Sequence, residues 1–147
     1  MKIGFANDHR GYELKEKLKF KLIELGYEVK DFGTNSAESV DYPDYAFKLG
    51  KEVVEKNVDF GVAICGSGIG ISIACNKVKG VRCAKINTIE EAKITRIDNN
   101  SNIIALGENT SVDTAFEMIK EFVTTEFSLE EKHHRRVDKI LKYEENN

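Results

Sequence analysis

Several features that mark particular protein classes are scarce in this sequence. The chain has one proline, no tryptophan and three cysteines, none of them in a CxxC pair. An odd number of cysteines without such a pair argues against a disulfide framework and favours a reducing compartment. The formal net charge is only -3 at pH 7, and this mild acidity argues against a nucleic-acid partner.

Long apolar runs are also absent. No segment approaches the roughly 20 apolar residues of a membrane-spanning helix. The N-terminus, MKIGFANDHR, reaches charged residues too soon for a signal peptide. We therefore expect a soluble, cytoplasmic protein without a membrane partner. With 147 residues, the chain is most simply one domain that spans residues 1–147.

Short apolar runs alternate with amphipathic segments along the chain. Because the runs show little polar alternation, they predict a parallel β-sheet with both faces covered by helices. The fold class is therefore α/β, with three layers and a five-stranded sheet. The expected strands are residues 2–6, 27–33, 59–64, 80–86 and 102–107. The expected helices are residues 11–26, 44–56, a helix from about 69, 88–98, 112–123 and a C-terminal helix from about 128.

Single residues mark the ends of several elements. Gly26 is typical of a helix stop, and a polar loop ends in the chain's only proline. Thr88 with Glu91, and Ser128 with Glu131, have the spacing of capping boxes, which begin helices. The second strand is more polar than the others, so we expect it near an edge of the sheet.

Ligands of open parallel sheets bind at the carboxyl ends of the strands, so the residues that follow each strand matter most. Polar and ionisable groups gather there, and we expect one functional edge. The segments assigned to this edge are Asn7–Gly11, Cys65–Gly70, Asn87–Thr88, Gly107 and the end of the helix before the fifth strand, Asp98–Asn102.

The segment CGSGIG, residues 65–70, joins an apolar strand to a helix. Glycines allow successive backbone N–H groups to converge on an anion at a helix N-terminus, and the same field favours the thiolate of Cys65. A base beside an anion hole can remove a proton next to a carbonyl and hold the enediolate that forms. Ser67 could add a hydroxyl donor to that hole.

Less specific interpretations of these residues stay open. A glycine-rich turn can serve tight packing alone, and a cysteine after a buried strand is often a small inert hydrophobe, as we expect for Cys75 and Cys83. Asp8 could be a helix N-cap beside an ordinary surface histidine.

Two other kinds of site are disfavoured. The glycine turn does not match the dinucleotide-binding fingerprint and lacks a Walker-type lysine. His133 and His134 are adjacent and diverge on a helix, so we expect no metal site.

The C-terminal segment carries a group of cations. Lys132 and Arg136 are four residues apart, hence on one helical face, and that spacing can bind a phosphate. The alternative is a solvated face balanced by Glu130 and Glu131. A substrate with an acidic proton beside a carbonyl at one end and a phosphate at the other would unite these features, as a sugar phosphate does.

Four stretches of this chain resemble a known family. They are NDHRGYELK at the N-terminus, ESVDYPDYA at 38–46, ICGSGIGISIACNK at 64–77 and GVR at 80–82. Together they resemble ribose-5-phosphate isomerase of type B and the related galactose-6-phosphate isomerase subunits, from residue 2 to about 140. The resemblance implies a Rossmann-like sheet, a homodimer or dimer of dimers, and active sites shared between subunits. It also implies aldose–ketose isomerisation without a metal or other cofactor, most simply of ribose 5-phosphate to ribulose 5-phosphate.

The resemblance assigns roles to matching positions. Cys65 would be the base that moves a proton between C1 and C2 of the sugar. The anion hole would be formed by Gly66, Ser67, Gly68, Ile69 and Gly70. Asp8 and Tyr42 would contact sugar oxygens, and His9 would face the polar end of the substrate. Asn99 would reach in from the partner subunit, and Lys132 and Arg136 would bind the phosphate.

Three positions depart from the family's pattern. Asp98 stands where the family usually has a ring-opening histidine, Asn109 where an arginine follows the fifth strand, and Lys132 where another arginine is usual. The enediolate machinery is therefore intact, while ring opening and phosphate capture are altered. The alternatives are an isomerase of another sugar phosphate, such as a hexose 6-phosphate, or a non-catalytic sugar-phosphate-binding protein. A thiol redox protein is disfavoured because no resolving cysteine is near Cys65.

Overall fold

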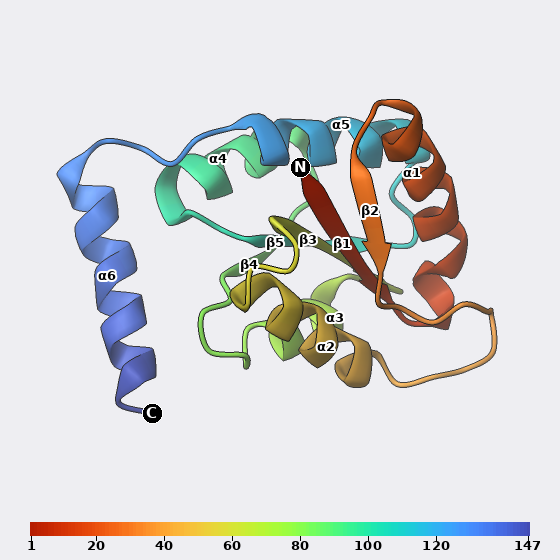
Figure 1. Ribbon diagram of the computed structural model, residues 1–147, viewed down its shortest axis with the longest axis horizontal. Coiled ribbons are helices and arrows are strands. Elements are labelled where there is room, and N and C mark those ends of the chain that lie inside the picture. Colours follow the sequence, from red (N-terminus) through yellow and green to blue (C-terminus); the bar gives the residue numbers. More distant parts are fainter.

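The structure, a computed structural model, describes residues 1–147 and contains one parallel sheet (Figure 1). The strands lie in the order β2-β1-β3-β5-β4 and all pairs are parallel. Their bounds are β1 Lys2–Asn7, β2 Glu28–Asp31, β3 Phe60–Cys65, β4 Cys83–Lys85 and β5 Ile103–Gly107. The polar second strand is an edge strand, as expected.

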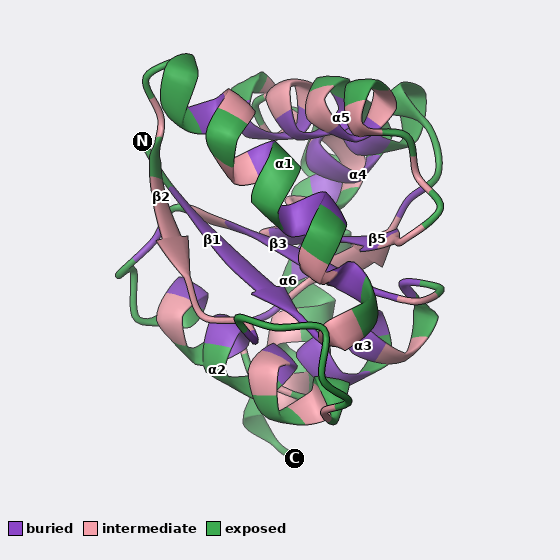
Figure 2. Cartoon of the chain, turned by 90° about the vertical axis from the view of Figure 1, so that its right-hand side faces the viewer, coloured by how far each residue is buried: buried purple, intermediate pink, exposed green.

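Helices cover both faces of this sheet. Their bounds are α1 Tyr12–Glu24, α2 Tyr42–Val54, α3 Ile69–Cys75, α4 Ile89–Asn99, α5 Val112–Thr124 and α6 Glu131–Glu145, with a short 3-10 helix η1 at His9–Gly11. Figure 2 shows α1, α4 and α5 above the sheet and α2 and α3 below it. None of the helices combines the length and apolar composition that a membrane span needs.

Each face has its own apolar core. Leu18 of α1 and Phe122 of α5 belong to a core of 16 buried residues, and Leu49 of α2 and Ile71 of α3 to a core of 13. Figure 2 shows buried residues along β1 and β3 and on the helix surfaces that face them. Burial on both faces explains why these strands lack polar alternation. The expected α/β, Rossmann-like three-layer fold is confirmed.

The second strand is tied to α1 by a buried charge. The Lys15 side chain is fully buried, and its Nζ lies 3.0 Å from Asp31 Oδ2 and donates to the Thr34 carbonyl at 2.6 Å. Asp31 also accepts from Lys19 Nζ at 2.8 Å and from the Gly33 N–H at 2.9 Å. A buried ammonium needs such partners, so this cluster fixes the edge strand against the helix.

Some expected boundaries were wrong. The second helix begins at Tyr42 rather than 44, because Pro43 stands in its first turn, where the missing N–H costs nothing. The fourth strand is shorter than 80–86. By contrast, Gly26 does follow the first helix, with φ of +98°, and Thr88 Oγ1 accepts from the Glu91 N–H at 3.1 Å.

The C-terminal helix begins at residue 131, not 128. Ser128 Oγ accepts from the Glu130 N–H at 2.9 Å, which makes a local turn before the helix, and the N-cap residue Glu130 has no side-chain cap. The capping box expected there is therefore not formed. Figure 1 shows α6 standing apart from the three layers, beyond the β4 edge.

The strand register corrects one expectation about the functional edge. Cys65 is level with Gly107, whereas Gly61, at the other end of the same strand, is level with Ile103. Residues 98–102 precede β5 and therefore lie at the amino end of the sheet, about 13 Å from the carboxyl end at 3.3 Å per residue. Asp98–Asn102 do not join Cys65 within one chain, because a segment before a parallel strand lies at the edge opposite to the segment after it.

Candidate functional site

The carboxyl end of β1 leads directly into η1. Asp8 is buried, and its Oδ1 accepts from the backbone N–H groups of Arg10 at 3.0 Å and Gly11 at 3.2 Å. The N-cap interpretation is therefore correct. It leaves a ligand-binding role open, because the other carboxylate oxygen accepts no hydrogen bond from the protein.

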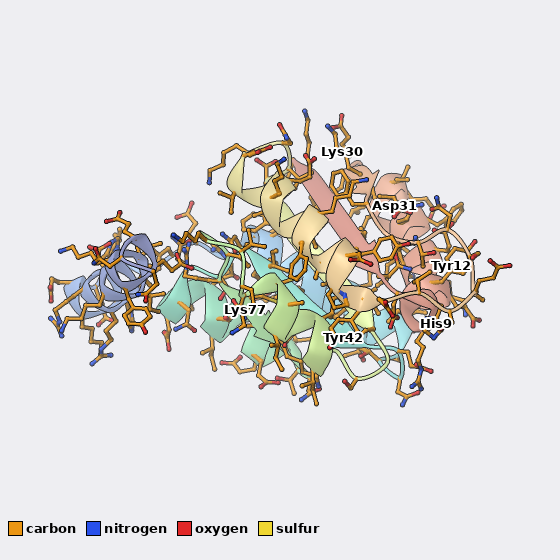
Figure 3. All side chains as sticks on the ribbon, turned by 90° about the horizontal axis from the view of Figure 1, so that it is seen from below. His9, Tyr12, Lys30, Asp31, Tyr42 and Lys77 are labelled. Carbon is orange, nitrogen blue, oxygen red and sulfur yellow. The ribbon has the colours of Figure 1, made fainter.

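The next residue, His9, has a defined orientation. Its Nδ1 accepts from the Val40 N–H at 3.2 Å, so the neutral ring carries its proton on Nε2. His9 and Tyr42 lie at the same end of the molecule in Figure 3, although they come from η1 and from the first turn of α2. Both side chains are thus available at the carboxyl edge of the sheet.

The glycine turn begins at a buried thiol. Cys65 is only 4% exposed, and its Sγ accepts a hydrogen bond from the Gly68 N–H at 3.1 Å. Gly68 has φ of +80°, and a Cβ there would lie 2.8 Å from the Leu106 carbonyl carbon. Only glycine fits this position, and an N–H directed at sulfur stabilises negative charge on the sulfur.

Ser67 is an exposed residue of the turn. Its Oγ accepts from the Ile69 N–H at 3.1 Å, which leaves the hydroxyl proton free to be donated to a ligand. Gly70 lies against the ring of Tyr42, since a Cβ on Gly70 would be 2.7 Å from Tyr42 Cζ. The Tyr42 hydroxyl has no hydrogen-bond partner in the protein, so it too is free for a ligand.

An ion pair that sequence reasoning missed spans the turn. Arg10 Nε lies 2.5 Å from Glu108 Oε2, and a Cβ on Gly66 would lie 3.0 Å from Arg10 Cζ. The pair joins η1 to the segment after β5. Glu108 directly follows β5 and Arg10 comes three residues after β1, and this place after a strand end is the signal that could have identified the pair.

A cavity of about 420 Å³ opens beside the turn. No hydrophobic residue lines it, and its only charged side chain is that of Lys85. The lining residues are Gly66, Ser67, Lys85, Asn87, Gly107, Asn109, Thr110, Ser111 and Thr114. Such a cavity suits a small polar ligand with several oxygen atoms.

Three of the residues assigned by resemblance lie elsewhere. Asn99 lies in a second cavity with Arg82, Ile140 and others, at the amino end of the sheet. Lys132 and Arg136 are exposed on α6 and have no ion pair within the chain. Figure 3 shows α6 at the opposite end of the molecule from the labelled His9 and Tyr42. One chain therefore does not bring these residues to Cys65.

The remaining thiols and histidines form no second centre. Cys75 is fully buried, and the hydrogen-bonding contact with Cys75, together with burial, raises the pKa of Cys83. Nδ1 of His133 lies 3.5 Å from Glu130 Oε2 and its Nε2 lies 3.5 Å from Asp98 Oδ1. No three His, Cys, Asp or Glu side chains cluster in a way that could hold a metal ion.

Fold and site together define an α/β protein with a glycine-rich turn and a buried thiol at the carboxyl edge of a parallel sheet. A family model described as Ribose/Galactose Isomerase matches residues 3–140. The chain belongs to the Ribose/Galactose Isomerase family, which confirms the resemblance seen in the sequence.

Individual relatives cover the whole chain. It is 45% identical over 149 residues to the putative sugar phosphate isomerase YwlF of Bacillus subtilis, covering 100% of this chain and 99% of the relative. It is 37% identical over 147 residues to ribose-5-phosphate isomerase B of Escherichia coli, covering 98% and 97%. The solved structure of Clostridium thermocellum ribose-5-phosphate isomerase B aligns with a TM-score of 0.95 and 44% identity, covering 99% of each chain.

Proposed function

We propose that this chain is an aldose–ketose isomerase of phosphorylated sugars, and that it interconverts ribose 5-phosphate and ribulose 5-phosphate. The observation that carries this proposal is the Gly68 N–H directed at Cys65 Sγ, 3.1 Å away, on a turn that opens into a polar cavity. Relatives of full length named ribose-5-phosphate isomerase B support the choice of substrate.

In this proposal Cys65 is the general base. Its thiolate removes the proton from C2 of the open-chain aldose, and the electron pair becomes the double bond of an enediolate. The thiol then returns the proton to C1 while the hydroxyl proton of O2 passes to O1, so C2 becomes the carbonyl of the ketose and C1 its hydroxymethyl group, without any net redox change. The N–H groups of the turn other than those of Gly68 and Ile69, which donate to Cys65 and Ser67, hold the negative oxygen of the intermediate together with the Ser67 hydroxyl.

The groups around the turn would position the sugar. Asp8 offers one carboxylate oxygen without a protein partner, and Tyr42 offers a hydroxyl without one. His9 would face the polar end of the substrate with its Nε2–H. Each of these groups lies at the carboxyl edge of the sheet and can orient a hydroxylated chain toward Cys65.

We also propose that a second copy of the chain completes the site. Asn99, Lys132 and Arg136 lie far from Cys65 within one chain, and the two cations have no ion-pair partner there. On α3, next to the turn, Ile69 and Ile73 are each 56% exposed, as expected of a surface that another subunit covers. A homodimer or a dimer of dimers, working in the cytoplasm, would satisfy these observations.

A second candidate changes the substrate, or keeps substrate binding without turnover. Asp98 lies 3.5 Å from His133, and a neutral residue, Asn109, lines the cavity. These positions differ from the pattern expected of a pentose 5-phosphate enzyme. They favour, as the alternative, an isomerase of another sugar phosphate or a non-catalytic binding protein.

The test is turnover of ribose 5-phosphate by the purified protein, with allose and galactose 6-phosphates as comparison substrates. Cys65→Ala should abolish turnover, whereas the matched control Cys75→Ala, at a buried thiol away from the turn, should retain it. If a hexose 6-phosphate is turned over much faster, the second candidate is correct. If a sugar phosphate binds but none is converted, the protein is a binder.

A further inference from the structure

The cavity beside the catalytic turn has a single charge that none of the roles above uses. Of the nine residues that line it, Lys85 alone carries a charged side chain, and the others are glycine, serine, threonine or asparagine. We propose that Lys85 binds the phosphate of the substrate, as the cation supplied by the same subunit as Cys65. This inference rests on the proposed function.

The position of Lys85 is unusual for a lysine. It is the last residue of β4, and it is followed by Ile86, which is buried in the core shared with α5. Its Nζ donates a hydrogen bond to Asn87 Oδ1. The ammonium thus has a fixed partner on the cavity wall and keeps two protons for a ligand.

The surroundings favour an anion at this point. Ser111 and Thr114 line the same cavity, and Ser111 is the N-cap of α5, a helix of 13 residues. The first N–H groups of a helix lack intrahelical partners, so its N-terminus adds a partial positive charge to that of the lysine. No carboxylate forms an ion pair with Lys85: the neighbouring Glu91 accepts from the Asn87 N–H at 2.8 Å, Glu108 is paired with Arg10, and the Asp113 side chain is 95% exposed.

The spacing agrees with a sugar phosphate. Strand β5 lies between β3, which ends at Cys65, and β4, which ends at Lys85. Two strand separations are about 10 Å, and Lys85 is level with Ala105, two residues or about 7 Å before the level of Cys65, an offset that the four-carbon lysine side chain can cover. A five-carbon chain with a terminal phosphate spans roughly 7 Å at about 1.5 Å per bond, and a hydrogen bond covers the rest. One molecule can therefore present its carbonyl carbon to Cys65 and its phosphate to Lys85.

The experiment compares Lys85→Met with Lys85→Arg, which keeps the charge. The matched control is Lys30→Met, at a half-buried lysine on the opposite edge strand, β2 (labelled in Figure 3). Affinity for inorganic phosphate is measured by calorimetry on each folded variant, together with KM and kcat for ribose 5-phosphate. Lys85→Gln serves as a second neutral variant in case Lys85→Met does not fold.

We expect Lys85→Met to weaken phosphate binding and to raise KM by about 10- to 100-fold, the size of a lost charge-assisted hydrogen bond. Lys85→Arg and Lys30→Met should stay within a few fold of the wild type. Unchanged phosphate affinity in Lys85→Met, or no phosphate binding by the wild type, would overturn the assignment. Lys85-dependent phosphate binding without turnover would retain it and instead refute the proposed isomerase activity.

Discussion

The Gly68 N–H donates to Cys65 Sγ at 3.1 Å, across a turn that only glycine can form. Because the thiol is buried, the Gly68 N–H and the neighbouring groups, and not water, set the electrostatic environment of the sulfur. The chemistry proposed for Cys65 therefore depends on the backbone conformation at Gly68.

Replacing Gly68 by alanine should abolish activity and destabilise the fold. A side chain there would adopt φ of +80° and would lie 2.8 Å from the Leu106 carbonyl carbon, so the turn must move away from Cys65. Gly26→Ala is the matched control, because Gly26 has φ of +98° but open space around a Cβ. It should cost only about 1 kcal/mol of unfolding free energy and leave kcat unchanged. Equal activity in both variants would refute the role of the turn.

Tyr42→Phe should lower kcat/KM by about tenfold, the size of one hydrogen bond to a sugar oxygen. The ring that packs on Gly70 is retained, so thermal stability should not change. Tyr27→Phe, before β2 and thus at the amino end of the sheet, should have no effect on kinetics. Steady-state kinetics on the two variants measures the difference. Equal kcat/KM values for Tyr42→Phe and Tyr27→Phe would refute the role of the Tyr42 hydroxyl.

Shared active sites predict complementation between two inactive variants. If Cys65 of one subunit works with Asn99 of its partner, a mixed dimer of Cys65→Ala and Asn99→Ala contains one intact site. Random mixing of equal amounts, by unfolding and refolding together, should restore about 25% of the wild-type activity. Refolded alone, each variant should remain inactive. No recovery in a mixture whose mixed dimers are verified by native mass spectrometry would argue that each site belongs to one chain.

The buried cluster at Asp31 predicts a pH-dependent stability. Burial alone would raise the pKa of Asp31, but hydrogen bonds from Lys19, the Gly33 N–H and Lys15 outweigh it and lower the pKa below 3.8. A lowered carboxylate pKa stabilises the fold above the pKa of the unfolded chain, and this contribution is lost as pH falls through the folded value.

Asp31→Asn should therefore cost on the order of 3 kcal/mol at pH 7, because it leaves Lys15 buried beside a neutral partner. Urea unfolding should show this cost shrinking between pH 6 and pH 3. Asp113→Asn, at a side chain that is 95% exposed, should cost almost nothing at either pH. If the loss of unfolding free energy in Asp31→Asn did not change with pH, the charge of Asp31 would not contribute to stability.

The sequence allowed the sheet and the turn to be predicted because both rest on local signals. Unalternating strands imply burial on two faces, and the CGSGIG segment implies close backbone approach. The prediction that Asp98–Asn102 lie at the carboxyl edge of the sheet was wrong, because the direction of the strand, and not the polarity of the residues, decides the edge. The predicted start of α6 was wrong because Ser128 accepts a hydrogen bond within a turn instead of capping the helix.

Other parts of the site could not be predicted, since they depend on distant segments meeting. The Arg10–Glu108 pair joins residues that follow the first and last strands of the chain. Lys85 was interpreted as part of a strand, and only the strand order shows that it borders the same cavity as Ser67. Residues that act across a subunit boundary leave no spacing signal in one chain.

The most direct test of the central claim follows the transferred proton. Ribose 5-phosphate would be incubated with the protein in deuterated water, and deuterium at C1 of the ketose and C2 of the aldose would be monitored by NMR. We predict deuterium incorporation with the wild type and with Cys75→Ala, and none with Cys65→Ala. Incorporation that persists in Cys65→Ala would contradict the account, because another group would then be the base.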